Sequence, residues 1–145
     1  MTKKDKALLL KDLCARFLYN VKVLYNNKVF NVDYISAIYE EIKLDDSSKN
    51  YTLNISVVKP YLFPLSSMTD RQVKEIQEII GNSDDACIIR KTYGLELWLN
   101  SIDTDPTIWV DTIFEVQDYL NKNHFDYRGL IEKGLAIDAI VLNIY

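Results

Sequence analysis

The chain has 145 residues, of which 48% are apolar and 26% charged, with a formal net charge of −4. This composition excludes wholesale disorder, and the length suits one domain with a real core. No apolar stretch approaches the roughly 20 residues of a membrane span, and no signal peptide precedes the first apolar run. Cys14 and Cys87 occur without a CxxC motif or a Cys/His cluster, which fits a reducing compartment. We therefore expect a cytoplasmic protein with no membrane partner.

Positive charge gathers at the start of the chain. Residues 1–28 contain seven Lys or Arg residues against Asp5 and Asp12, so the remainder carries −9. A pI near 5 does not favour nucleic acid as a partner. The interpretation we favour is that the basic segment faces the acidic rest of its own domain. A weak nucleic-acid contact through these lysines is the alternative.

A helix is predicted over residues 4–19. Apolar residues recur there at spacings of three and four, namely Leu9, Leu10, Leu13, Cys14, Phe17 and Leu18. Because Cys14 belongs to this stripe, it is predicted to be a buried structural thiol.

A β-rich region follows the first helix. Asn26-Asn27 tolerates positive φ and predicts a hairpin between residues 21–25 and 28–32. Strand character continues over residues 34–42, and a polar turn at 45–50 precedes another alternating strand at 51–58. These segments predict an antiparallel meander with one buried face.

The segment 59–65 carries two prolines, which predicts an extended connector that interrupts the meander. Thr69-Asp70-Arg71-Gln72 fits a capping box, and Gly81 marks the end of the helix it begins.

The last third of the chain predicts a strand pair at 86–92 and 95–99, and Cys87 in its first strand is expected in the core. A second capping box at 112–115 predicts a helix to about Asn123, with Val116, Tyr119 and Leu120 facing inward. A turn of helix at 129–133 and an apolar tail at 137–145 complete the pattern. We predict one α+β domain over 1–145, an antiparallel sheet of four to five strands with about three helices packed on one face.

The segment 123–134 has the highest density of chemically active groups. It brings together the His, a carboxylate, an Arg and two rings, in His124, Phe125, Asp126, Tyr127 and Arg128. The interpretation we favour is structural, with His124 capping a helix end and Asp126 and Arg128 tying the loop together. A binding surface made of these five residues is the second interpretation. Acid/base catalysis by His124 and Asp126 is the third, although no nucleophile or metal ligand accompanies them.

The other polar and aromatic groups of the sequence give weaker indications of a functional site. Asp103 and Asp105 begin like a calcium loop, but Pro106 follows and no glycine or terminal Glu completes it. The remaining carboxylate pairs, at 40–41, 45–46 and 84–85, are predicted to lie in solvated loops. Tyrosines in or beside the meander could form a protein-binding face, although partial burial is the favoured interpretation; these are Tyr19, Tyr25, Tyr34, Tyr39 and Tyr51. Trp98 and Trp109 are expected in the core. We expect no catalytic set, metal site or cofactor.

Three sequence blocks carry a resemblance, Asp12–Arg16 (DLCAR), Lys59–Thr69 (KPYLFPLSSMT) and Asn123–Asp138 (NHFDYRGLIEKGLAID). In this order they resemble a family of short uncharacterised proteins from gut Bacteroidetes and from the phages and prophages of these bacteria. The chain departs from the family pattern at residues 17–20, where the family has a Pro and a Gly. The resemblance implies a small intracellular or phage-encoded accessory protein and no particular chemistry.

The function we predict is a non-enzymatic accessory protein that acts through a protein–protein contact. The alternatives are a small enzyme using His124 and Asp126, and nucleic-acid contact through Lys3, Lys4, Lys6 and Lys11. No sequence pattern argues for or against homodimerisation.

Overall fold

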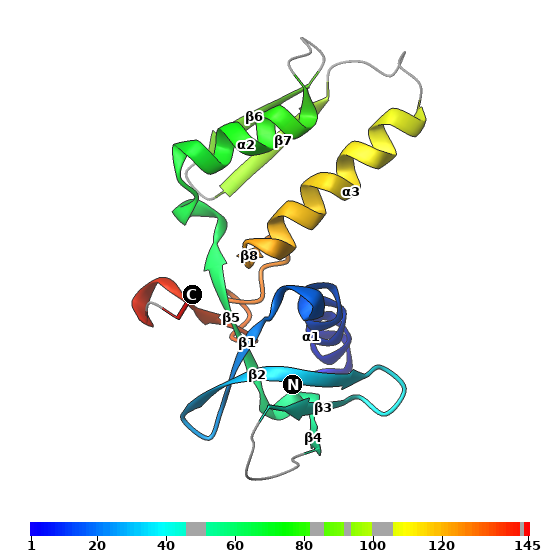
Figure 1. Cartoon of the computed structure of the whole chain (residues 1–145), viewed down its shortest axis with the longest axis vertical. Helices are drawn as coiled ribbons and strands as arrows, with labels where there is room; N and C mark the ends of the chain where they lie inside the picture. Colours follow the sequence, from blue (N-terminus) through cyan, green and yellow to red (C-terminus); the bar gives the residue numbers. More distant parts are fainter. Residues whose placement is uncertain (46–51, 82–85, 92–93, 100–105, 143) are drawn as a thin grey trace. The chain divides into compact units, whose positions relative to one another are not determined.

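The structure is a computed structural model that describes residues 1–45, 52–81, 86–91, 94–99, 106–142 and 144–145, with side chains described outside 82–111 and 141. The chain divides into two compact units (Figure 1). Unit 1 comprises Met1–Phe63 and Arg128–Tyr145, and unit 2 comprises Pro64–Tyr127. The predicted α+β class is confirmed, and the described ranges contain three α-helices, as predicted. That the whole chain behaves as one domain stays a prediction.

Unit 1 is built on a mostly antiparallel sheet with the strand order β4-β3-β2-β1-β5. The strands are β1 (Lys22–Tyr25), β2 (Lys28–Ser36), β3 (Glu41–Leu44), β4 (Thr52–Asn54) and β5 (Lys59–Pro64). A short strand from the end of the chain, β9 (Ile137–Asp138), pairs parallel to β5. The sheet therefore has more strands than predicted, and β9 makes it mixed.

The predicted β1–β2 hairpin is confirmed. Tyr25 pairs with Lys28, and the two turn residues Asn26 and Asn27 have φ angles of 47° and 59°. Positive φ at both positions defines the turn that matches the twist of the flanking strands. Asparagine adopts this conformation more readily than most residues, so the local sequence specifies the turn.

Three expectations for this sheet were wrong. The strand predicted over 51–58 ends with β4 at Asn54, and Ile55–Val57 forms a 3₁₀ turn. The strand predicted over 34–42 ends at Ser36, and a turn with φ +53° at Glu40 leads into β3. The segment 59–65 is not a connector, because it forms β5, in which Pro60 pairs with Val23. A proline removes a single ladder donor, and its neighbours Tyr61 and Leu62 still pair with β9.

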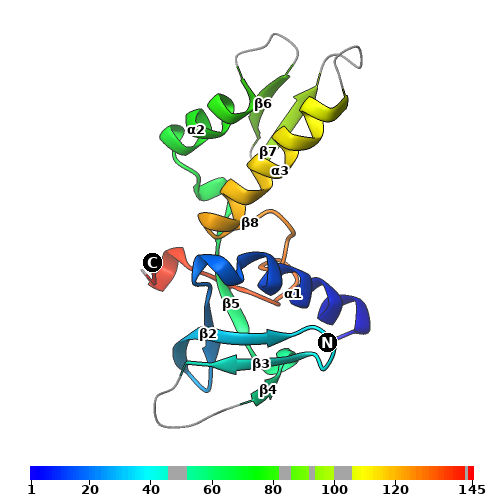
Figure 2. The same ribbon diagram turned by 45° about the vertical axis from the view of Figure 1, so that its right-hand side comes forward.

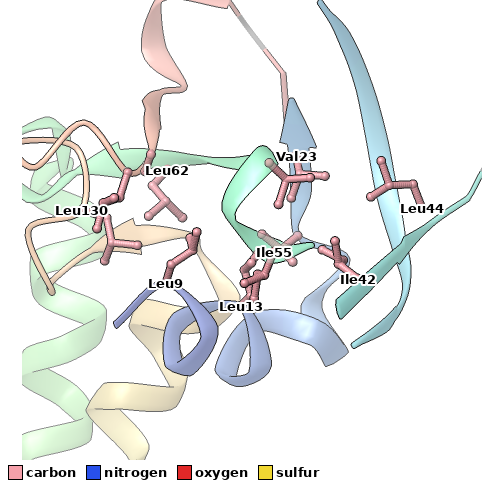
Figure 3. Close-up of a cluster of buried hydrophobic side chains, with 12 residues drawn as sticks. Leu9, Leu13, Val23, Ile42, Leu44, Ile55, Leu62 and Leu130 are labelled. Atoms are coloured by element: carbon pink, nitrogen blue, oxygen red, sulfur yellow. The ribbon is translucent and has the colours of Figure 1, made fainter. Parts of the chain in front are cut away.

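Helix α1 (Lys3–Arg16) contributes to the core of unit 1. Figure 3 shows Leu9 and Leu13 directed into a cluster of buried side chains from the sheet and the C-terminal segment. The prediction that Cys14 is buried was wrong, since its side chain is exposed. The buried positions of α1 after Leu9 are Asp12, Leu13 and Arg16. A short 3₁₀ turn, Phe17–Tyr19, then leads to Asn20, whose φ of 56° is a conformation that glycine adopts freely.

Unit 2 contains α2 (Asp70–Ile80), α3 (Pro106–Lys122) and a hairpin of β6 (Ala86–Lys91) and β7 (Gly94–Leu99) (Figure 2). The Thr69–Gln72 capping box and the hairpin are confirmed. The start of α3 was predicted too late, because proline is favoured at the first helical position and Pro106 opens the helix. Thr112–Glu115 therefore lies inside α3. A two-residue strand, β8 (Phe125–Asp126), follows α3.

Several expectations lie outside the described residues. They concern the turn at 46–50, the carboxylates at 84–85, 103 and 105, Tyr51, and the side chains of Cys87, Trp98 and Trp109. The segment 129–133 is described, and it forms turns in place of the predicted helical turn, with positive φ at Gly129 and Gly134.

Candidate interaction surface

The outward face of α3 carries a row of side chains at helical spacing, which is exposed at Phe114 and Asp118 and buried at Asn121, where 6% is exposed. Phe114, Gln117, Asp118 and Asn121 stand at positions i, i+3, i+4 and i+7, so they share one face. Val116, Tyr119 and Leu120 lie on the opposite side and are half-buried, as predicted. The two faces of α3 thus differ in kind, one packed within unit 2 and the other carrying an aromatic ring among polar groups.

The inward face of α3 is tied to α2 by a hydrogen bond. The hydroxyl of Tyr119 donates to Oε2 of Glu75 over 2.7 Å, and Nε of Arg71 donates to Oε1 of the same carboxylate over 2.9 Å. The bond from Tyr119, together with that from Arg71, holds the pKa of Glu75 below its usual value. Burial raises the pKa of Tyr119, and the Glu75 carboxylate raises it further. These contacts fix which side of α3 faces outward.

A hollow of about 390 Å³ lies on the outward face. Among the side chains that the structure describes, its lining is Phe114, Glu115, Gln117, Asp118 and Asn121. Phe114 is 63% exposed, which is unusual for a phenylalanine in a folded protein. An exposed ring beside two carboxylates and two amides has the chemistry to bind an apolar side chain of another molecule that is flanked by basic groups.

Tyr127 orders the polar part of the hollow. Its hydroxyl accepts a hydrogen bond from Nε2 of Gln117 and donates one to Oδ1 of Asn121, each over 3.0 Å. The two amides are thereby held in defined orientations, which lowers the entropy that a partner must remove on binding. Tyr127 belongs to the predicted binding set, and its side chain contacts the lining of this hollow.

The other predicted residues of unit 2 are buried. His124 is 7% exposed, Phe125 2% and Asp126 8%. His124 has φ +58°, and its N–H donates to the carbonyl of Asn121 over 3.1 Å, so it ends α3 in a left-handed conformation. Burial of His124 and Asp126 leaves no exposed acid/base pair at these positions. The binding role assigned to the segment 124–128 stays a prediction.

Arg128 belongs to unit 1, where it takes part in a buried ionic cluster. Its Nη1 donates to Oδ1 of Asp12 over 2.8 Å. Arg16 approaches the same carboxylate with two nitrogens, Nε to Oδ2 at 2.9 Å and Nη2 to Oδ1 at 3.0 Å. The side chains of Asp12 and Arg16 are fully buried and that of Arg128 is 9% exposed. The cluster joins α1 to the C-terminal segment across 116 positions of sequence.

The predicted tyrosine face of the sheet is only partly present. Tyr34 and Tyr39 are 51% and 71% exposed, whereas Tyr25 is half-buried against Phe30 with ring centroids 6.4 Å apart. In the portion of the chain that the structure describes, no three His, Cys, Asp or Glu residues group together as metal ligands would. Within the same portion, no helix has the length and apolar character needed to cross a membrane.

Sequence reasoning missed the lining of the hollow. Thr112–Glu115 was interpreted as a helix start, which placed Phe114 and Glu115 in a first turn and hid the periodic row that continues from them. The signal that could have found this face is the spacing of Phe114, Gln117, Asp118 and Asn121 opposite the apolar stripe.

Comparison with known proteins found no matching family model, no matching curated protein and no matching solved structure.

Proposed function

We propose that the chain is a non-enzymatic protein-interaction module that binds a basic, apolar-bearing segment of a partner protein in the hollow on α3. The observation that carries the proposal is Phe114, a large ring 63% exposed at the start of a row in which Tyr127 holds the amides of Gln117 and Asn121. Aromatic side chains dominate the binding free energy of protein interfaces, where polar neighbours supply orientation.

The charge of unit 2 supports a basic partner. Its sequence holds 12 acidic and five basic residues, a formal net charge of −7. Glu115 and Asp118 bring part of that charge to the hollow itself. Complementary charge speeds association and selects against acidic partners.

The resemblance to proteins of Bacteroidetes and their phages supports an accessory role inside a bacterial cell, and this assignment is part of the proposal. Catalysis by His124 and Asp126 is not proposed, because both side chains are buried.

A displayed library of random 12-residue peptides, selected against the whole chain, tests the proposal. We expect the enriched peptides to combine Lys or Arg with large apolar residues. Phe114→Ala should weaken binding of a selected peptide about 10- to 30-fold, the range of a moderate interface hot spot. Ile113→Ala is the matched control, because Ile113 is 46% exposed on the same helix and does not line the hollow.

A second pair of variants tests the charge. Glu115→Gln with Asp118→Gln should weaken binding and flatten its dependence on salt. Glu78→Gln, an exposed carboxylate on α2, should leave both unchanged. Enrichment of acidic peptides, or equal affinity of the Phe114→Ala and Ile113→Ala variants, would contradict the proposal.

A further inference from the structure

A turn in unit 1 presents two large apolar side chains to solvent. The turn between β2 and β3, residues 37–40, carries Ile38 at 87% and Tyr39 at 71% exposure. Such exposure leaves apolar surface in water, and burying it against a partner would be favourable. A solvated turn would be expected to carry Gly, Asn, Asp or Ser at these places.

Contacts on both sides hold this turn in one conformation. The N–H of Tyr39 donates to Oγ of the buried Ser36 over 3.3 Å, and the carbonyl of Glu40 accepts from the N–H of Ile55 over 3.0 Å. The carboxylate of Glu40 also forms an ion pair with Lys6 of α1. A rigid turn loses little entropy on binding, so its exposed side chains are suited to act as anchors.

The surroundings of the turn hold exposed lysines as well as the carboxylates of Glu40 and Glu41. The ion pair with Lys6 brings the first turns of α1 next to residues 37–40, and Lys3 and Lys4 there are exposed. The acidic residue of the same helix turn, Asp5, is engaged in the capping box with Thr2. Unit 1 as a whole holds 12 basic and nine acidic residues, a formal net charge of +3.

We infer that the partner of the α3 hollow is a second copy of this chain, whose turn 37–40 enters the hollow. Ile38 and Tyr39 of one copy would pack on Phe114 of the other, and Lys3 and Lys4 would lie beside Glu115 and Asp118. The inference rests on the proposed function and names the partner of that site. It is argued from complementary chemistry, since an apolar projection near two exposed lysines meets a hollow that offers one aromatic ring and two carboxylates.

The two contact surfaces differ, so the contact is heterologous. Each copy offers one turn and one hollow, and such contacts build rings or open chains. The association should therefore grow with protein concentration beyond a dimer. It should also weaken as salt is added, because part of the attraction is between exposed charges.

Sedimentation velocity of the full chain and two variants tests this arrangement. The turn variant Ile38→Asp/Tyr39→Asp lacks the projection and the hollow variant Phe114→Asp lacks the receiving surface, so each alone should be monomeric. Mixed in equal amounts, they should form a discrete dimer, because one intact turn and one intact hollow remain. Leu18→Asp, at a position 82% exposed in unit 1 and outside the turn, should associate as the wild type does.

Two outcomes overturn the inference. The first is a wild type that stays monomeric at all concentrations. The second is a mixture of the two variants that forms no dimer although circular dichroism shows each variant to be folded. Selected peptides that still bind the monomeric wild type through Phe114 would then leave the proposed function standing. Equal affinity of the Phe114→Ala and Ile113→Ala variants for a selected peptide would contradict the proposed function, and the inference that rests on it would fall with it.

Discussion

The buried cluster of Asp12, Arg16 and Arg128 makes a quantitative prediction about stability. One carboxylate there accepts three hydrogen bonds of 2.8–3.0 Å from two guanidinium groups. Asp12→Asn keeps the size of the side chain and removes its charge. Both arginine side chains would then keep their positive charges without the carboxylate that accepts their hydrogen bonds.

The expected cost follows from the burial of the partners. Removing one member of a fully buried ion pair costs about 3–5 kcal/mol, because a buried charge is left uncompensated. Arg128→Met should cost less, about 1.5–3 kcal/mol, since Asp12 keeps its two bonds from Arg16 and loses one charge-assisted bond. The order of the two variants is therefore fixed by the geometry.

Urea unfolding followed by circular dichroism gives the free energies. Hydrogen exchange read by mass spectrometry then assigns the loss, because the chain has two units that can open separately. Asp12→Asn should speed exchange in α1 and β1 and leave α2 and α3 unchanged. The milder Arg128→Met variant keeps the measurement possible if Asp12→Asn does not fold.

The matched control is Asp33→Asn. Asp33 pairs with Lys43 at 2.9 Å, but their side chains are 51% and 35% exposed, so this pair should contribute about 0–1 kcal/mol. A cost for Asp12→Asn no larger than that for Asp33→Asn would refute the assignment of a buried cluster. So would an additive double variant of Asp12 and Arg128, because residues in direct contact should show a coupling energy.

Three further predictions concern single residues. Asn27→Gly should raise the free energy of unfolding by a few tenths to about 1 kcal/mol in a urea titration, because φ is +59° at that position and glycine adopts it without strain. Tyr145 is 40% exposed as a whole, but its hydroxyl donates to the carbonyl of Tyr61, and desolvation there raises its pKa to about 12. The stability that the neutral hydroxyl contributes is complete below pH 10 and is lost as pH rises from 10 towards 12. Between pH 9 and pH 11 the free energy of unfolding should therefore fall less for Tyr145→Phe than for the wild type. Cys14 should react with a thiol reagent in the native protein, because its side chain is exposed. Cys14→Ser should change the free energy of unfolding by less than about 0.5 kcal/mol. A thiol that reacts only after the protein unfolds would contradict this exposure.

Features encoded by residues close together in sequence were predicted correctly. The capping box of Thr69 with Gln72 and the Asn26-Asn27 turn each depend on groups within three positions of one another. Their geometry needs no knowledge of the rest of the fold. The same reasoning failed for the start of α3, because Thr112 begins a capping-box pattern that a longer helix from Pro106 overrides.

Features that depend on distant partners were not predicted. In α1, the apolar period places Cys14 on the buried side, yet Asp12 and Arg16 take buried positions because Arg128 meets them from the other end of the sequence. Charged residues are assigned to the surface by pattern alone, since burying them is costly without partners. The β5 strand was missed for a related reason, because the partners of Tyr61 and Leu62 in β9 lie far along the chain.

The two candidate sites show what an accumulation of reactive side chains in sequence can mean. The segment 124–128 was singled out by its density of polar groups, and the contacts of His124, Tyr127 and Arg128 described above are internal ones, which end a helix, order two amides and compensate a buried carboxylate. Phe114, which has the exposure expected of a binding residue, lies in a part of the sequence without a dense group of reactive side chains. A polar group gains most from a partner when water is excluded, so a dense polar segment is as much a sign of internal organisation as of binding. An apolar ring gains nothing from water, and its exposure on an ordered helix is therefore the stronger argument for a partner.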